Sequence, residues 1–84
     1  MTENNEISFY STRWCPDCYR SKRILDQRGV AYQYIDINAD ADGCAYVEKV
    51  NNGNRSVPTI VFPDGDILVE PSNATLSKKL DSLA

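Results

Sequence analysis

Two cysteines, Cys15 and Cys18, are separated by two residues and are the side chains of this sequence best suited to chemistry. Their segment, WCPDC at residues 14–18, lies where a predicted strand ends and a predicted helix begins. Unpaired N–H groups and a partial positive charge at a helix N-terminus stabilise a thiolate, the nucleophilic form of cysteine. We therefore expect Cys15 to attack a disulfide. Cys18, one turn further along and more shielded, would resolve the mixed disulfide by bonding to Cys15.

A zinc site and a pair of buried structural cysteines are the alternatives to redox chemistry at Cys15 and Cys18. Half of a zinc site would need ligands from a second chain, because the sequence holds three cysteines and no histidine. The proline between the two cysteines and the strand-to-helix context favour redox chemistry and no metal. The third cysteine, Cys44, lies in a predicted helix beside two alanines; we expect it to line the core, with a regulatory thiol as the alternative.

The charge around the pair differs from that of the whole chain. Nine Lys and Arg face twelve Asp and Glu, for a net charge of -3, yet residues 13–28 carry five basic and only two acidic side chains. Arg13 is the base nearest to Cys15 and could stabilise its thiolate or an anionic thiol substrate. Asp17 should instead raise the pKa of that thiol. The other arginines of the segment are expected mainly to face solvent: Arg20, Arg23 and Arg28.

Length and composition exclude several classes of protein. The 84 residues suffice for a single domain, 1–84. Without histidine there is no Ser-His-Asp triad and no His-ligated zinc. The acidic balance argues against nucleic acid, and no apolar run approaches the length of a membrane span. Residues 1–6 are polar, unlike a signal peptide. We expect a cytoplasmic monomer that binds neither nucleic acid nor membrane.

The elements that must position the cysteines follow from hydrophobic periodicity and turn residues. Strands are predicted at residues 7–10, 31–37, 57–62 and 67–69, and helices from Cys15 to about residue 28, from an Asn38 N-cap to about Val50, and from residues 71–73 onward. The helix between the first two strands requires them to be parallel, whereas the last two form an antiparallel hairpin. The order β-α-β-α-β-β-α predicts an α/β fold, a four-stranded mixed sheet flanked by helices.

Apolar stripes indicate which sides of two helices are buried. Cys18, Ser21 and Leu25 share one side of the first helix. Leucines at i, i+4 and i+7 are predicted to form the buried side of the last helix: Leu76, Leu80 and Leu83.

Pro58 begins the predicted third strand, where the missing N–H of proline is tolerated. The residues alone leave two interpretations open. Pro58 could simply start the strand. It could also be a cis-proline whose neighbouring backbone faces the thiols and accepts a substrate as an added strand.

The whole pattern resembles the glutaredoxins. The resemblance rests on residues 9–18, on residues 29–32 with 35–37, and on residues 51–60, so it covers essentially the whole chain. It implies a thioredoxin-like fold with a cis-Pro58. It also implies a cytoplasmic dithiol oxidoreductase that reduces mixed disulfides between proteins and a small thiol, and also protein disulfides, with no bound cofactor.

Three departures from the usual glutaredoxin pattern concern the small thiol. Thr12 stands where a lysine usually binds the glycine carboxylate of glutathione, and Asp17 replaces a Tyr or Phe. Residues 69–72, VEPS, replace a Gly-Gly pair. The pattern YSTxWC at residues 10–15, with residues 51–59, is similar to mycoredoxins, which reduce mixed disulfides of mycothiol. The small thiol stays open between mycothiol and glutathione.

The resemblance also implies a substrate contact at the backbone of Val57, beside Pro58. The other candidates for substrate binding surround the thiols: Thr12, Arg13, Trp14, Asp17 and Arg55. Two further functions remain as alternatives. Because residues that usually bind glutathione are replaced, one alternative is a thioredoxin-like electron donor that is recycled by a flavoprotein disulfide reductase. An iron–sulfur carrier would hold its cluster between two chains, but such relatives usually have a single active-site cysteine with no proline after it.

Overall fold

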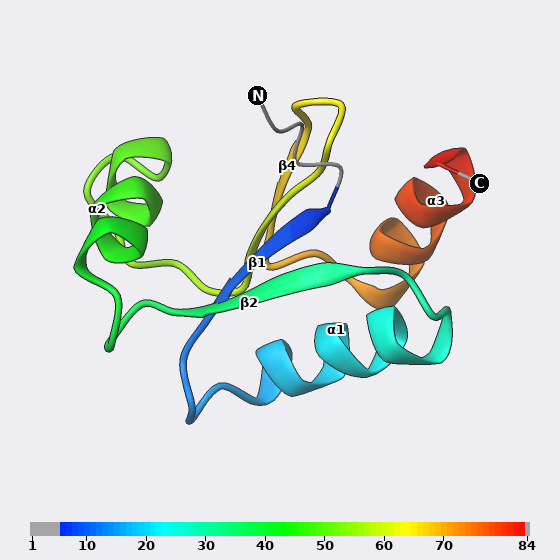
Figure 1. Ribbon diagram of the computed structural model, residues 1–84, viewed down its shortest axis with the longest axis horizontal. Coiled ribbons are helices and arrows are strands. Elements are labelled where there is room, and N and C mark those ends of the chain that lie inside the picture. Colours follow the sequence, from blue (N-terminus) through cyan, green and yellow to red (C-terminus); the bar gives the residue numbers. More distant parts are fainter. Residues whose placement is uncertain (1–5, 84) are drawn as a thin grey trace.

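The computed structural model describes residues 6–83, so residues 1–5 of the segment considered for a signal peptide lie outside the described part. The elements follow the predicted order β-α-β-α-β-β-α (Figure 1). Their bounds are β1 Ile7–Ser11, α1 Pro16–Gln27, β2 Tyr32–Asp36, α2 Ala41–Val50, β3 Thr59–Val61, β4 Ile67–Val69 and α3 Asn73–Leu83. The strand ends differ from the predicted ranges by a few residues, most of all in the short β3.

The four strands form one mixed sheet in the order β2-β1-β3-β4. β1 runs parallel to β2, with Phe9 opposite Tyr34, and antiparallel to β3, with Phe9 opposite Ile60. β3 and β4 are antiparallel neighbours. Figure 1 shows α2 on one side of the sheet and α1 and α3 on the other. We call these sides the α2 face and the α1/α3 face. The predicted α/β architecture is confirmed.

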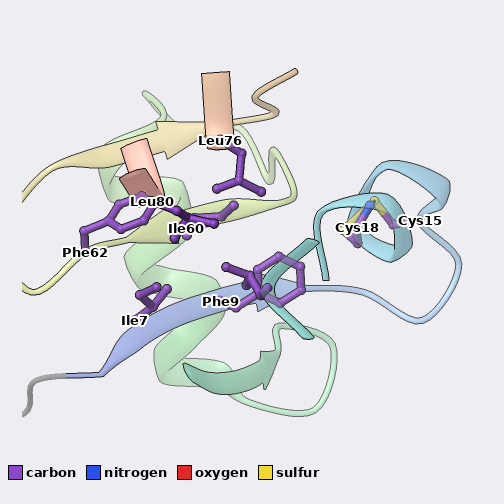
Figure 2. Packing of buried hydrophobic residues seen from close by; sticks show 9 residues of the cluster. Ile7, Phe9, Cys15, Cys18, Ile60, Phe62, Leu76 and Leu80 are labelled. Carbon is purple, nitrogen blue, oxygen red and sulfur yellow. A yellow bond between two sulfur atoms is a disulfide. The ribbon is translucent and has the colours of Figure 1, made fainter. Parts of the chain in front are cut away.

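The main core lies on the α1/α3 face, between the sheet and helices α1 and α3. Phe9, Leu25, Ile60 and Leu76 are all fully buried there. Alternation along β1 explains this, because residues 7, 9 and 11 are buried while residues 8 and 10 are only half-buried. Figure 2 shows the cysteine pair at one end of this cluster. The packing that stabilises the fold therefore also fixes the position of the two sulfur atoms.

The start of α2 was predicted wrongly. Asp40, not Asn38, is the N-cap, and its carboxylate accepts the N–H of Gly43 at 2.9 Å. Asn38 lies in the preceding turn, where its N–H donates to the side chain of Asp36 at 2.9 Å. The Asp36 side chain stabilises a turn at this point and so delays the helix.

The burial of the last helix was predicted correctly for Leu76 and Leu80 but wrongly for Leu83, which is 42% exposed. Leu83 keeps the same angular position on α3. It lies about 10 Å further along the axis than Leu76, where the main core no longer covers it.

Candidate active site

Cys15 is the N-cap of α1, with an extended backbone at φ -124° and ψ 101°. Its Sγ accepts the N–H of Cys18 at 3.1 Å, and its carbonyl oxygen accepts the N–H of Tyr19 at 3.1 Å. Pro16 occupies the first turn, where no N–H is needed. The local sequence thus places a sulfur atom where serine or aspartate usually caps a helix. The same N–H that caps the helix would stabilise a thiolate.

The two cysteines form a disulfide, with their Cα atoms 5.1 Å apart. Cys15 is 9% exposed and Cys18 is 2% exposed. The sulfur at the helix terminus is therefore the one that a substrate reaches more easily, and the second sulfur is shielded inside the first turn.

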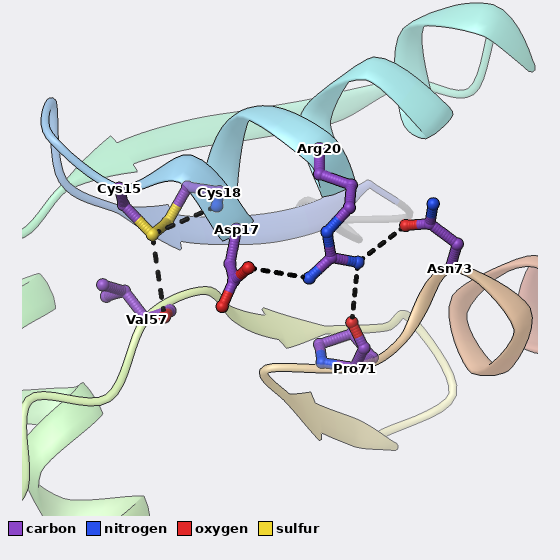
Figure 3. A network of polar contacts seen from close by, with 7 residues as sticks. All are labelled: Cys15, Asp17, Cys18, Arg20, Val57, Pro71 and Asn73. Carbon is purple, nitrogen blue, oxygen red and sulfur yellow. Dashed lines mark hydrogen bonds and ion pairs between the residues drawn. A yellow bond between two sulfur atoms is a disulfide. The ribbon is translucent and has the colours of Figure 1, made fainter.

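The loop before β3 passes beside the cysteine pair. The peptide bond between Val57 and Pro58 is cis, as the family resemblance implied. The carbonyl oxygen of Val57 lies 3.8 Å from Sγ of Cys15 (Figure 3). Pro58 is buried, and its carbonyl oxygen accepts the N–H of Glu70 at 2.9 Å. The structure thus confirms a cis-Pro58 whose neighbouring backbone lies beside the thiols, and the docking of a substrate there stays a prediction.

Arg20 connects the active-site helix to the start of α3. Its guanidinium binds Asp17 at 3.0 Å, the side chain of Asn73 at 2.6 Å and the carbonyl oxygen of Pro71 at 3.4 Å. Figure 3 shows Asp17 on the turn between the cysteine pair and Arg20. Arg20 was expected mainly to face solvent; it is instead half-buried, and Asp17 and Asn73 supply acceptors on both sides of it. The Asp17 carboxylate is held in an ion pair.

Three other candidates lie in the loop before α1. Trp14 is 87% exposed, Arg13 is exposed, and Thr12 is half-buried. The hydroxyl of Tyr19 donates to the main-chain oxygen of Arg13, which fixes the loop against α1. Within residues 6–83 the Arg13 guanidinium forms no ion pair. The side chains of Arg13 and Trp14 therefore face solvent in the loop directly before Cys15, whereas that of Thr12 is partly covered.

The structure holds Arg55 against α2. Its guanidinium binds the carboxylate of Glu48 at 2.8 Å, and this hydrogen bond raises the pKa of Arg55 above its ordinary value. Arg55, Glu48 and Cys44 line a cavity of about 410 Å³ on the α2 face. The partner of Arg55 is thus an acidic side chain of α2 rather than Cys15 or Cys18.

Cys44 does not line the core, which corrects the prediction. It is half-buried, has no disulfide partner, and its thiol donates toward Glu48 at 3.9 Å. A carboxylate four residues later on the same helix was the sequence signal for this contact. In the described part of the chain, no group of three or more His, Cys, Asp or Glu side chains is placed to hold a metal ion. Over the same residues, no helix is long and apolar enough to cross a bilayer.

Two further residues of this region were not predicted to be site residues. Asn73 binds Arg20 from a position 53 residues away, which no local pattern reveals. Ser21 is fully buried on the same side of α1 as Cys18, and its hydroxyl oxygen has no hydrogen-bond partner. The apolar stripe of α1 included Ser21 without indicating that it would lack a partner.

Comparisons with known proteins agree with this geometry. The family model for glutaredoxins matches residues 7–68. Mycoredoxin 1 of Corynebacterium glutamicum is 36% identical over 80 residues, covering 95% of this chain and 99% of that protein. The crystal structure of a mutant thioredoxin-like protein superimposes with a TM-score of 0.78 at 28% identity, covering 89% of this chain and 99% of the other. A complex of buckwheat glutaredoxin with glutathione gives a TM-score of 0.70 at 25% identity, covering 95% and 73%.

Proposed function

The chain belongs to the glutaredoxin family of thiol–disulfide oxidoreductases, and from this premise we propose that Cys15 is its nucleophile and Cys18 its resolving thiol. Glutaredoxins take their electrons from a small thiol. One observation carries the assignment: Cys15 is the N-cap of α1, accepts an N–H at 3.1 Å, and lies within disulfide reach of a more deeply buried cysteine.

In the proposed reaction, the Cys15 thiolate attacks the small-thiol sulfur of a mixed disulfide. A bond forms between Cys15 and the small thiol, the original S–S bond breaks, and the protein thiolate leaves and takes up a proton. A second small-thiol thiolate can then attack the same sulfur, which regenerates Cys15 and releases a small-molecule disulfide. Alternatively Cys18 attacks Cys15, and the Cys15–Cys18 disulfide forms as the small thiol leaves.

The backbone of Val57 is the proposed docking point for the substrate. Among the described residues its N–H and carbonyl take part in no backbone hydrogen bond, and the carbonyl lies 3.8 Å from Sγ of Cys15. A substrate segment could pair here as an added strand, which would bring its sulfur to Cys15. The side chains that border the pair would contact the rest of the substrate: Thr12, Arg13, Trp14, Asp17 and, beside α2, Arg55.

We favour mycothiol over glutathione as the small thiol. Glutathione carries two carboxylates, whereas mycothiol is uncharged. Asp17 places a carboxylate beside the cysteine pair, and Thr12 provides no cation where a lysine usually binds glutathione. The similarity to mycoredoxin 1 points the same way. Small thiols are kept reduced in the cytoplasm, so we propose that the protein works there. We also propose that it acts as a monomer.

The role assignment is tested with Cys15→Ser and Cys18→Ser variants on a peptide joined to mycothiol by a disulfide. Loss of Cys15 should abolish turnover. Loss of Cys18 should spare much of it, because a second small thiol can complete the cycle. Equal activity in the two variants would contradict the assignment.

The choice of thiol is tested by comparing mycothiol and glutathione disulfides of one peptide. The natural protein should prefer the mycothiol disulfide, and Thr12→Lys should shift the preference toward glutathione. If neither disulfide is turned over while a flavoprotein disulfide reductase reduces the Cys15–Cys18 pair, the thioredoxin-like alternative replaces this proposal.

A further inference from the structure

Ser21 is the polar side chain that the fold leaves unsatisfied. It lies on the buried side of α1 between Cys18 and Leu25 and is fully buried. Across residues 6–83, its Oγ is the one buried side-chain nitrogen or oxygen that has no hydrogen-bond partner. A buried hydroxyl without a partner costs free energy, because it has lost its water and gained nothing in return.

The helix brings this hydroxyl close to Cys18. Residues three apart on a helix are neighbours, and helical side chains lean toward the N-terminus, so Ser21 covers the turn that carries Cys18. The usual acceptor for a helical serine is the carbonyl four residues earlier, here that of Asp17, but no such bond forms. In the disulfide state Sγ of Cys18 is bonded to Cys15, and the Ser21 hydroxyl forms no hydrogen bond to this sulfur atom.

We propose that Ser21 is a positioning residue whose hydroxyl donates a hydrogen bond to Cys18 once the disulfide is opened. The hydroxyl would then be unsatisfied in the disulfide state and satisfied in the dithiol state. Ser21 would therefore shift the equilibrium of the pair toward the dithiol. The inference rests on the proposed function only in assuming that Cys15 and Cys18 cycle between disulfide and dithiol.

Reduction of the disulfide creates an acceptor for the Ser21 hydroxyl. Two thiol groups of the reductant supply two electrons and two protons; the S–S bond between Cys15 and Cys18 breaks, and a disulfide forms in the reductant. Ser21 keeps its own proton throughout. It gains an acceptor because Sγ of Cys18, released from Cys15, becomes a thiol or thiolate in a site that is only 2% exposed. A donor in such a site favours the thiolate more than the thiol.

The test is to equilibrate the natural protein and a Ser21→Ala variant with reduced and oxidised dithiothreitol. We expect the variant to shift roughly tenfold toward the disulfide, about 30 mV for a two-electron couple, since one hydrogen bond to the Cys18 sulfur is lost. The disulfide form of Ser21→Ala should be at least as stable to heat as the natural disulfide form, because the unsatisfied group is gone. In a Cys15→Ser background, Ser21→Ala should raise the pKa of Cys18.

Ser11→Ala is the matched control. Ser11 is also a buried serine, 1% exposed, but its hydroxyl already donates to the carbonyl of Thr12 at 3.1 Å. This variant should lower the stability of both redox forms equally and leave the dithiothreitol equilibrium unchanged.

An unchanged equilibrium in Ser21→Ala, or a shift toward the dithiol, would overturn the proposal. An equal loss of stability in both redox forms would also overturn it, because that result means a purely structural role. The equilibrium with dithiothreitol does not depend on any small thiol of the cell or on turnover. A failure of the proposed enzymatic function would therefore be seen in the activity assays and not here.

Discussion

Helices α1 and α2 both have a cysteine near their N-termini, but the sulfur atoms of Cys15 and Cys44 have opposite surroundings. On α1 the cysteine is the N-cap, and its sulfur receives an N–H from Cys18 at 3.1 Å. On α2 the N-cap is Asp40, and Cys44 instead points its thiol at the Glu48 carboxylate 3.9 Å away. A donor suits a thiolate and an acceptor suits a thiol. Position relative to the helix terminus, rather than exposure, separates the two kinds of cysteine.

The two helices also differ in how they are fixed. α1 is joined to β2 by the Tyr32 hydroxyl, which donates to Asp26 at 2.6 Å, and to α3 by an ion pair of Arg28 with Asp81 at 2.6 Å. α2 approaches the sheet closely at Gly43, is joined to β3 by the Asn51 side chain, which donates to the Thr59 hydroxyl at 3.2 Å, and has a cavity beside Cys44. The face that carries the disulfide is thus fixed by polar contacts at the C-terminal end of α1 as well as by the main core.

The largest expected effect is a difference in alkylation rate between Cys15 and Cys44. When the reduced protein is treated with limiting iodoacetamide at neutral pH, Cys15 should react roughly twentyfold faster than Cys44, because a larger fraction of it is thiolate. Peptide mass spectrometry over time measures both rates. Cys15→Ser should lose the fast phase. Faster labelling of Cys44 would show that exposure outweighs the helix terminus.

The next effect concerns the α2 face alone. A Cβ added at Gly43 would lie 2.7 Å from Cγ2 of Ile35 and 3.5 Å from Cε1 of Tyr10. Gly43→Ala should therefore cost about 1–3 kcal/mol from overpacking, partly offset by the roughly 1 kcal/mol that alanine contributes to a helix. Urea unfolding should show a net loss of about 1 kcal/mol. The labelling rate of Cys15 should not change; if it falls, the two faces are coupled.

A smaller effect should follow from changing the charged side chains near Cys15. Asp17→Asn removes a carboxylate from the first turn of α1, so the pKa of Cys15 should fall. Arg20→Gln removes the cation that binds Asp17 and should raise it. The pH dependence of the alkylation rate measures both shifts. Shifts of the same sign would mean that the two variants disturb the loop rather than the electrostatics.

The smallest effect is the pH dependence of the contact between α1 and β2. The hydrogen bond from Tyr32, with that from Lys22, lowers the pKa of Asp26 below its ordinary 3.8. A carboxyl whose pKa is lowered by folding stabilises the protein above its unfolded pKa. That stabilisation is lost as pH falls through the folded value. Asp26→Asn should therefore flatten the loss of thermal stability between neutral pH and about pH 3. Identical slopes for the variant and the natural protein would contradict this.

The sequence by itself determined the parts that depend on near neighbours. The spacing of Cys15 and Cys18, with Pro16 between them, predicted that Cys15 lies at the N-terminus of a helix, because helix starts are decided within one turn. Periodicity predicted the order of elements and the buried sides of α1 and α3, apart from Leu83. The errors arose where a neighbouring side chain competed or an element extended past its partners: Asp36 delayed α2, and Leu83 lies beyond the main core.

Only the tertiary structure decided which distant groups meet. The carbonyl oxygen of Val57 reaches Cys15 across 42 residues, and Asn73 reaches Arg20 across 53 residues. Such contacts depend on how the sheet orders its strands and on which face each helix covers, and these choices minimise exposed apolar surface over the whole chain. The missing partner of Ser21 belongs to the same class, since an absent contact is visible only when every neighbour is in place.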